Sequence, residues 1–265
     1  MTERDRQLLE LEGFALELGA TAGGIAKAYF RSDFSIDNKD ADGFDPVTSA
    51  DHAIESVLRE AIAEAYPDHG IVAEEFGNQA GSADYTWYID PIDGTRAFMM
   101  GSPLWGTLVG LVAGTKPVVG LLVQSALGEV FLGSDSGSWL ITEAGRRRLR
   151  TRETSSLAAA TLTSTDPDLF GPAQLSAFQR VRDACRLTRY GGDCYNYAML
   201  AAGFVDLVVE DGLKPYDIVP LIPIIESAGG VVTDWQGGSV MAGGSVVAAA
   251  GKALHAEAIA LLAEA

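Results

Sequence analysis

Apolar residues near the N-terminus recur at the spacing of one helix face. Leucine, phenylalanine and alanine follow each other three or four positions apart, which predicts a long first helix over about residues 3–30. The polar, glycine-containing stretch 32–45 predicts a loop. A second helix should follow it, with Thr48 or Ser49 as its N-cap residue and an apolar face that begins at Ile54.

Short apolar runs bounded by glycine or proline fill the middle of the chain. Their β-branched and aromatic side chains pack well on a pleated surface, so the runs predict strands rather than helices. The predicted strands lie near residues 69–74, 84–90, 105–113, 116–124 and 128–133.

From about residue 155 the pattern alternates between strand-like and helix-like segments. It predicts strands over 159–164, 185–189, 205–210, 231–234 and 245–250, and helices over 173–183, 194–203, 217–228 and 252–264. Strands separated by helices imply a layered α/β arrangement. We therefore expect an N-terminal α+β half over residues 1–150 and a C-terminal α/β half over residues 151–265, packed closely as one unit.

The composition is that of a globular protein with an acidic surface. Of the 265 residues 48% are hydrophobic and 21% are charged, and the net charge of −17 argues against non-specific binding to nucleic-acid backbone. No run of about 18 apolar residues would span a membrane, and no signal peptide is evident at the N-terminus. Two cysteines, Cys185 and Cys194, make no disulfide framework, which favours a cytoplasmic protein.

One dense positive run interrupts the acidic composition. Arg146, Arg147 and Arg148 follow one another after Glu143. The run predicts an exposed hairpin or loop, and the alternative is a basic binding patch.

Two carboxylates stand three residues apart at the end of a predicted strand, in the stretch Asp90-Pro91-Ile92-Asp93-Gly94-Thr95. Pro91 has no N–H for a strand ladder, so we expect the strand to end at Asp90, and Gly94 permits a sharp turn. The Asp90 and Asp93 side chains should converge at this junction. Sites of this kind hold divalent cations beside a phosphate group.

Further acidic residues follow other predicted elements. Glu74 and Glu75 come after an apolar strand, Asp51 lies near the start of the second helix, Asp217 opens a helix, and Glu210 closes a strand. Carboxylates are the hard oxygen ligands that Mg²⁺ prefers, and no histidine or cysteine cluster competes with them. An Asp-x-x-Asp pair alone also occurs in turns and caps, so spacing leaves the metal site and a structural role open.

Taken together, the acidic segments are more specific than any one of them. In chain order they are Pro46–Asp51, Ala73–Glu75, Trp87–Thr95, Tyr216–Asp217 and Glu226–Gly230. This order resembles the inositol monophosphatase family of Mg²⁺-dependent, lithium-sensitive phosphatases, over about residues 40–235. The resemblance implies an αβαβα sandwich in which the first half carries most metal ligands and the second supplies the last ligand and the substrate pocket.

Other segments look like the histidinol-phosphate phosphatase branch of that family. They are Arg96–Phe98, Trp105–Leu108, Tyr190–Tyr195 and Leu213–Asp217. Many family members have glycine where this chain has Ala73, and inositol-type members commonly have tryptophan where it has Tyr216. Inositol-type members usually carry Ser/Thr-Ala where Asp193-Cys194 stand, which puts a carboxylate where a neutral polyol would not require one.

The resemblance implies a set of metal ligands and catalytic residues. Glu74, Asp90 and the Ile92 carbonyl would hold one Mg²⁺, and Asp90, Asp93 and Asp217 a second; a third, weaker ion would bind near Glu74, and Mn²⁺ is the alternative metal. A metal-activated water would attack the phosphate. Glu74, Thr95 and Asp51 would be the catalytic residues, of which Thr95 and Asp51 would orient this water.

It also implies a set of substrate-binding residues. These are Asp93, Gly94, Thr95, Arg96, Arg189, Asp193, Glu210 and Asp217. Backbone N–H groups of Gly94 and Thr95 would bind phosphate oxygens, while Asp193 and Glu210 would pair with positive charge on the substrate. The alternatives are a helix N-cap for Asp193, an exposed strand-end charge for Glu210 and a surface strand-end residue for Arg189.

We therefore expect a histidinol-phosphatase of histidine biosynthesis that acts on a small phosphorylated substrate and forms a homodimer. The first alternative is an inositol-1-monophosphatase or a broad-specificity sugar-phosphate phosphatase. A remoter one is a non-catalytic metal- or anion-binding protein of the same fold.

Overall fold

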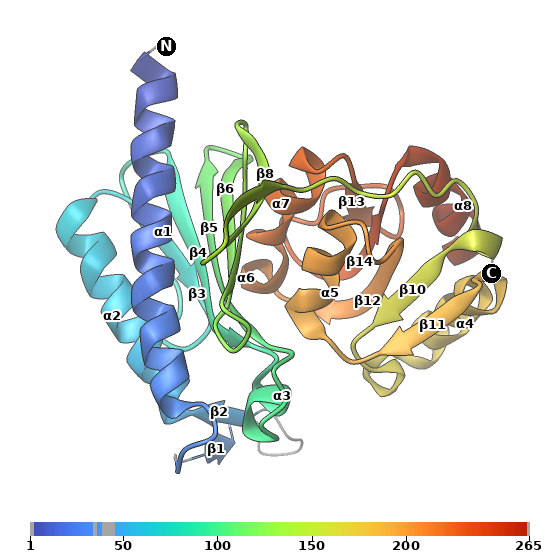
Figure 1. Cartoon of the computed structure of the whole chain (residues 1–265), viewed down its shortest axis with the longest axis horizontal. Coiled ribbons are helices and arrows are strands. Elements are labelled where there is room, and N and C mark those ends of the chain that lie inside the picture. The colour runs from blue at the N-terminus through green and yellow to red at the C-terminus, as the bar shows by residue number, and fades with distance from the viewer. Residues whose placement is uncertain (1–2, 34–35, 39–45, 264–265) are drawn as a thin grey trace.

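Layers of helix and sheet alternate in the structure, a computed structural model that describes residues 3–33, 36–38 and 46–263 (Figure 1). One outer layer consists of α1 (Glu3–Tyr29) and α2 (Ser49–Ala65), the middle layer of α5 (Asp193–Ala201), α6 (Pro215–Ile218) and α7 (Leu221–Ser227), and the other outer layer of α4 (Pro172–Ala184) and α8 (Lys252–Leu262). A sheet lies on each side of the middle layer. The expected αβαβα sandwich is confirmed.

Within the described ranges the sheet between α1 and α7 has seven strands in chain order. They are β3 (Gly70–Ala73), β4 (Tyr85–Asp93), β5 (Gly106–Ala113), β6 (Lys116–Gln124), β7 (Glu129–Ser134), β8 (Gly137–Thr142) and β9 (Gly145–Arg148). β3 and β4 run parallel, and the other neighbours are antiparallel. The β8–β9 hairpin confirms that the arginine run is an exposed hairpin, since all four residues of β9 are exposed.

The second sheet has five strands in the described ranges, in the order β11-β10-β12-β14-β13. Their bounds are β10 (Thr161–Ser164), β11 (Leu187–Tyr190), β12 (Leu207–Leu213), β13 (Val231–Asp234) and β14 (Gly244–Ala249). The chain crosses from the first sheet to the second between β9 and the short helix η1 (Leu157–Ala159). The division into two halves at residue 150 stays a prediction. The described helices include no apolar stretch of the length that crossing a lipid bilayer requires.

Both predicted N-terminal helices are confirmed, and their apolar faces explain where they pack. Leu11, Leu18 and Ala22 of α1 and Ile54 and Leu58 of α2 are buried in one core with the seven-stranded sheet. Burying an amphipathic face in this way provides most of a helix's stability in a protein. Thr48 is the N-cap of α2, as expected.

Some sequence-based expectations are wrong. β4 does not end at Asp90 but continues to Asp93, because the register shifts between these residues and leaves Pro91 outside the regular ladder. Part of the expected loop 32–45 is strand, since β1 (Ile36–Asn38) pairs with β2 (Pro46–Thr48); residues 34–35 and 39–45 lie outside the described residues. The strand β8 had no counterpart among the predicted elements.

The expected helix over 217–228 is also wrong. It begins at Pro215 and is divided into α6 and α7, with Pro220 as the N-cap of α7. A proline ring clashes with the preceding helical turn and lacks the N–H that would continue it. The division places Asp217 and the apolar residues of α7 in separate helices.

Three glycines side by side allow the middle layer to approach the first sheet closely. Gly110 of β5 pairs with Gly120 of β6, which pairs with Gly133 of β7. A Cβ atom at Gly120 would overlap the Pro220 carbonyl oxygen, and one at Gly133 would overlap the Ile224 backbone. The glycine row therefore fixes how closely α7, and the α6 segment before it, lie against the sheet.

Gly120→Ala should accordingly destabilise the protein by about 1–3 kcal/mol, the usual cost of overpacking a rigid contact. Urea denaturation followed by circular dichroism measures this change in the free energy of unfolding. The matched control is Gly13→Ala in α1, where an added Cβ meets no atom within 4 Å. It should stabilise the protein by about 0.5–1 kcal/mol because alanine favours helix over glycine. Equal stability of Gly120→Ala and the wild type would disprove the close contact.

Candidate active site

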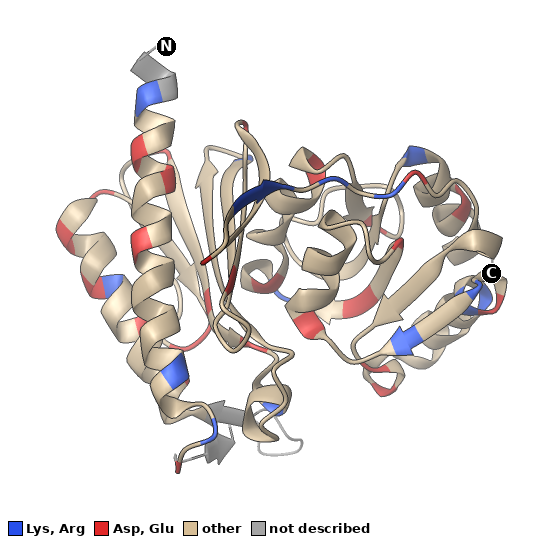
Figure 2. Ribbon diagram, viewed as in Figure 1, with Lys and Arg blue, Asp and Glu red and all other residues tan. Residues whose placement is uncertain are grey.

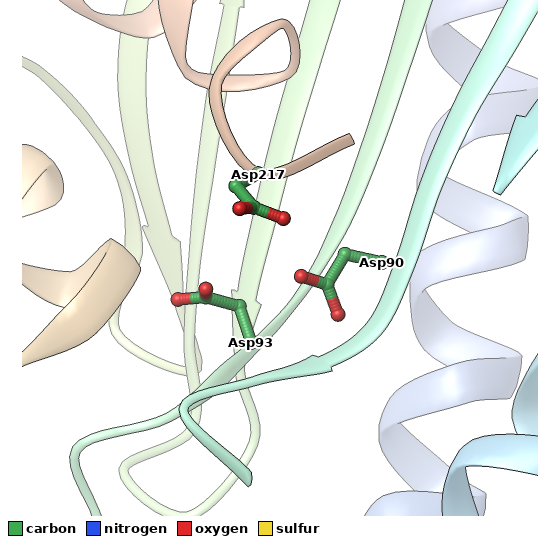
Figure 3. A group of neighbouring side chains, drawn as sticks. All are labelled: Asp90, Asp93 and Asp217. Atoms are coloured by element: carbon green, nitrogen blue, oxygen red, sulfur yellow. The ribbon is translucent and has the colours of Figure 1, made fainter. Parts of the chain in front are cut away.

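Three aspartates from two distant parts of the chain lie close together around one space (Figure 3). Asp90 and Asp93 lie at the end of β4 and Asp217 lies in α6, and among the described residues each offers an oxygen within 4.8 Å of the others. Residues three apart on a regular strand face opposite sides of the sheet. The register shift between Asp90 and Asp93 breaks that alternation, and it brings both carboxylates to one side.

Burial and repulsion between neighbouring carboxylates raise the pKa values of these three aspartates. Burial raises the pKa of Asp90 well above its usual value, and Glu74, Asp93, Asp217 and Asp51 raise it further. Burial raises the pKa of Asp93 to about 6 and that of Asp217 well above the usual range. One oxygen of Asp90 is buried and accepts no hydrogen bond from a described residue. A divalent cation would stabilise the ionised form of these buried carboxylates, so the cluster fits a metal site.

Glu74 stands just outside the three-aspartate group. It follows β3, which pairs in parallel with β4 so that Ala73 lies opposite Ile89, and this places Glu74 beside the cluster. Its charge raises the pKa of Asp90, Asp93 and Asp217 alike. The structure thus brings together the four acidic residues expected as metal ligands.

Glu75 follows Glu74 but has a different environment. Its backbone N–H donates to Glu55 Oε2 at 2.6 Å, and its carboxylate lies 3.7 Å from His52 Nε2. The buried Glu55 therefore holds the chain after β3 in place, which fixes where Glu74 emerges.

The two expected water-orienting residues, Asp51 and Thr95, are each held by hydrogen bonds. Asp51 is buried, and its Oδ2 accepts hydrogen bonds from Thr48 N–H at 2.8 Å and Thr48 Oγ1 at 2.5 Å, which closes a capping box on α2. Thr95 opens the short helix α3 (Thr95–Met99), and its hydroxyl donates to the Ile92 carbonyl at 3.0 Å. Gly94 has φ 87°, so the turn between Ile92 and Thr95 uses the left-handed region that glycine adopts without strain.

A cavity of about 110 Å³ opens beside the aspartates and reaches into the second sheet. Its lining includes Asp93, Asp193, Glu210 and Asp217. Acidic residues expected to bind metal and acidic residues expected to bind substrate therefore share one cavity.

Glu210 is held on the cavity wall by three hydrogen bonds. Its Oε1 accepts from Thr165 N–H at 3.0 Å and Thr165 Oγ1 at 2.6 Å, and its Oε2 accepts from Tyr197 Oη at 3.1 Å. Burial nevertheless raises its pKa to about 7. Glu210 lies within β12, so the expectation that it closes the strand is wrong. It is buried, so the alternative of an exposed charge is wrong as well.

Asp193 carries a carboxyl group in a strained backbone position. Its φ is 45°, in the left-handed region, and Gly192 rather than Asp193 is the N-cap of α5, so the capping alternative is wrong. Burial raises its pKa to about 8, with further contributions from Asp93 and Glu210, while Arg96 acts in the opposite direction. The carboxyl group is thus held among like charges rather than used to cap the helix.

The N-terminus of α5 is also joined to the aspartate cluster. The Cys194 N–H donates to Asp93 Oδ2 at 2.5 Å. This hydrogen bond orients Asp93 and joins α5, which carries Asp193, to the end of β4, which carries the aspartates expected to bind metal.

The two arginines expected near the substrate differ in position. Arg96 is exposed on α3 and is close enough to Asp193 to lower its pKa. Arg189 is exposed on β11, the edge strand of the second sheet, and is not among the residues that line the cavity. Its role in substrate binding stays a prediction.

Several residues of the cavity had no predicted role. They include Thr165, Phe170, Tyr197, Leu213 and Leu221. Tyr197 lies four residues after Asp193, so helical spacing could have indicated that both face the same cavity. No comparable signal marks Phe170, which follows the short helix η2 (Pro167–Leu169).

Comparisons with known proteins cover nearly the whole chain. A profile described as the inositol monophosphatase family matches residues 7–265. The bifunctional phosphatase IMPL2 of Arabidopsis thaliana is 40% identical over 94% of this chain and 75% of the relative. The histidinol-phosphatase of Chlorobaculum parvum is 32% identical over 94% of this chain and 95% of the relative. The structure of an inositol monophosphatase from Zymomonas mobilis superposes with a TM-score of 0.85 at 34% identity, covering 99% of both chains.

Proposed function

Because this chain belongs to the inositol monophosphatase family of phosphatases, we propose that it is a metal-dependent histidinol-phosphatase. One observation carries the choice of substrate. Asp193 and Glu210, both with raised pKa values, line the same cavity as Asp93 and Asp217. A substrate with a phosphate at one end and positive charge at the other would complement this cavity.

The metal side would hold two or three Mg²⁺ ions, with Mn²⁺ as the alternative. Asp90, Asp93 and Asp217 would be ligands together with Glu74 and the Ile92 carbonyl. Bound cations would supply positive charge to the phosphate oxygens and activate a water molecule. The chain's own contribution is to orient the carboxylates, as the Cys194 N–H does for Asp93.

Around the reacting phosphate, Thr95 and Asp51 would orient the attacking water and accept its proton. Both groups are anchored: Asp51 accepts hydrogen bonds from Thr48, and Thr95 donates to the Ile92 carbonyl. Fixed groups lose little freedom when the substrate binds. The N–H groups of Gly94 and Thr95 would hold phosphate oxygens.

The substrate side favours histidinol phosphate, which carries an ammonium group and an imidazole ring. Burial is the largest cause of the raised pKa of both Asp193 and Glu210, and the exposed Arg96 lowers only that of Asp193 among these two described residues. A cationic substrate would offset the cost of ionising them, and a neutral polyol would not. Phe170 and Leu213 add an apolar wall against which the ring could pack.

The second candidate is an inositol-1-monophosphatase or a phosphatase of broad sugar-phosphate specificity. Its support is the Zymomonas mobilis structure, which bears the name inositol monophosphatase at 34% identity. The carboxylates of Asp193 and Glu210 weigh against it, because a polyol gives them no positive charge to pair with. Cytoplasmic location and a homodimer are further parts of the proposal.

Growth of a histidine auxotroph tests the proposal. Expression of the chain in a bacterial strain that lacks its own histidinol-phosphatase should restore growth without histidine. The Asp93→Asn variant, expressed to the same level, should fail to do so. Soluble wild-type protein that leaves the strain dependent on histidine would contradict histidinol phosphate as the substrate.

A further inference from the structure

A second hollow lies away from the aspartates, along the segment that crosses from β9 to η1. Its volume is about 630 Å³, and its lining comes from residues 148–155, from 226–229 after α7, and from 250–253 at the start of α8. Figure 2 shows basic residues following one another along the crossing segment, in a chain whose 36 acidic residues outnumber its 19 basic ones. The proposed phosphatase reaction makes no use of this hollow.

Four basic side chains line it: Arg148, Arg150, Arg152 and Lys252. The three arginines are spaced two residues apart, and side chains at that spacing in an extended chain lie on one side. Leu149, between the first two arginines, is fully buried. In a chain of net charge −17, this concentration of positive charge stands out. We call these four residues and the hollow they line the arginine groove.

This positive charge is only partly neutralised within the protein. Neither Arg150 nor Lys252 makes an ion pair with any described residue, while Arg152 lies 3.4 Å from the Asp206 carboxylate. The lining also contains Glu153 and Glu226, so the four basic groups exceed these two carboxylates and that of Asp206 by one positive charge. The excess is available to an anion from outside the chain.

The crossing segment is held at fixed points, so its arginines are presented in a defined arrangement. Leu149 N–H donates to the Ser138 carbonyl at 2.8 Å, and Thr151 N–H donates to the Ala228 carbonyl at 3.0 Å. Thr154 Oγ1 donates to Asp206 Oδ1 at 2.7 Å. A backbone anchored in this way loses little conformational freedom when a ligand binds.

We propose that the arginine groove binds a small phosphate-type anion of several charges, such as a polyphosphate. Guanidinium groups match phosphate oxygens in pairs, and the hydroxyl of Ser155 adds a hydrogen-bond donor. The hollow has the size of a small-molecule site, and no aromatic side chain lines it to stack on a base. The charge of −17 on the whole chain repels a long nucleic-acid backbone.

Isothermal titration calorimetry of the full chain with sodium tripolyphosphate, in a buffer without Mg²⁺ so that no metal at the aspartate cluster attracts the anion, tests the proposal. The wild type should bind the anion, and raising the salt to about 0.5 M should weaken binding because exposed charges are screened. Arg150→Glu and Lys252→Glu should each weaken binding by about tenfold or more. Melting temperatures of both variants should stay near that of the wild type, since both side chains are exposed.

Two further variants separate binding in the groove from general charge attraction and from binding at the aspartate cluster. Arg147→Glu makes the same charge change at an exposed residue of β9 outside the groove, and it should alter the affinity by less than about twofold. Asp93→Asn should bind tripolyphosphate as the wild type does, because the aspartate cluster is not involved. Equal weakening by Arg147→Glu, loss of binding in Asp93→Asn, or no binding to the wild type would each overturn the proposal.

Discussion

The Asp93→Asn variant should fold normally and lose turnover by a factor of about a hundred to a thousand. The asparagine side chain would keep the shape of the aspartate and could still accept the hydrogen bond that Cys194 N–H gives to Asp93 Oδ2. The substitution would remove a negative charge that lies within 4.8 Å of Asp90 and Asp217 oxygens and would weaken the hold on metal. Phosphate release measured across a Mg²⁺ titration would give both the lost turnover and the weakened metal affinity.

Although Asp93→Asn should lower turnover, it should raise the thermal stability of the metal-free protein. Burial and Glu74 both raise the pKa of Asp93, so ionising this group costs free energy in the metal-free protein. The neutral amide removes that cost, and metal-free Asp93→Asn should melt at a higher temperature than the metal-free wild type. Asp135→Asn, in an exposed ion pair with Lys116, is the control and should change neither quantity noticeably. Near-normal turnover of Asp93→Asn would contradict the metal assignment.

Asp193→Asn should change which substrate the enzyme prefers. We expect kcat/KM on histidinol phosphate to fall about a hundredfold, because a carboxylate in the cavity would no longer face the substrate's positive charge. On inositol 1-phosphate it should fall no more than a few fold. Asparagine tolerates the left-handed backbone found at φ 45° better than most residues, so the fold should survive the change.

Asp211→Asn is the matched control for Asp193→Asn. Asp211 lines the same cavity, but its Oδ1 accepts a hydrogen bond from Ser245 Oγ at 2.5 Å and no role in substrate binding is assigned to it. Its substitution should leave the ratio of the two kcat/KM values unchanged. Equal losses on both substrates in Asp193→Asn would remove the proposed charge pairing.

The sequence predicted the aspartate cluster better than the backbone that builds it. Asp90 and Asp93 were expected to converge because they follow a strand closely, and they do. A register shift within β4 brings the two side chains to one side. This shift depends on pairing with β5 and leaves no signal in the local sequence pattern. Asp217 joins them because α6 packs against β4 and β5, a contact between distant segments, so its place could be expected from family resemblance but not from periodicity.

The substrate side of the cavity was harder to predict for the same reason. Asp193 and Glu210 were named from the resemblance, yet their local environments were not foreseen. The capping role considered for Asp193 belongs to Gly192, and the exposure considered for Glu210 is replaced by burial against Thr165 and Tyr197. Which residues meet across two sheets is decided by tertiary packing rather than by neighbours in the sequence.

The most direct test compares kcat/KM of the wild-type enzyme on histidinol phosphate and inositol 1-phosphate, each with Mg²⁺ and with a metal chelator. Phosphate release from both substrates should require the metal, and histidinol phosphate should be preferred by about tenfold or more. Equal or better turnover of inositol 1-phosphate would contradict the assignment of Asp193 and Glu210 to a cationic substrate. Full activity in the presence of the chelator would contradict the role given to Asp90, Asp93 and Asp217.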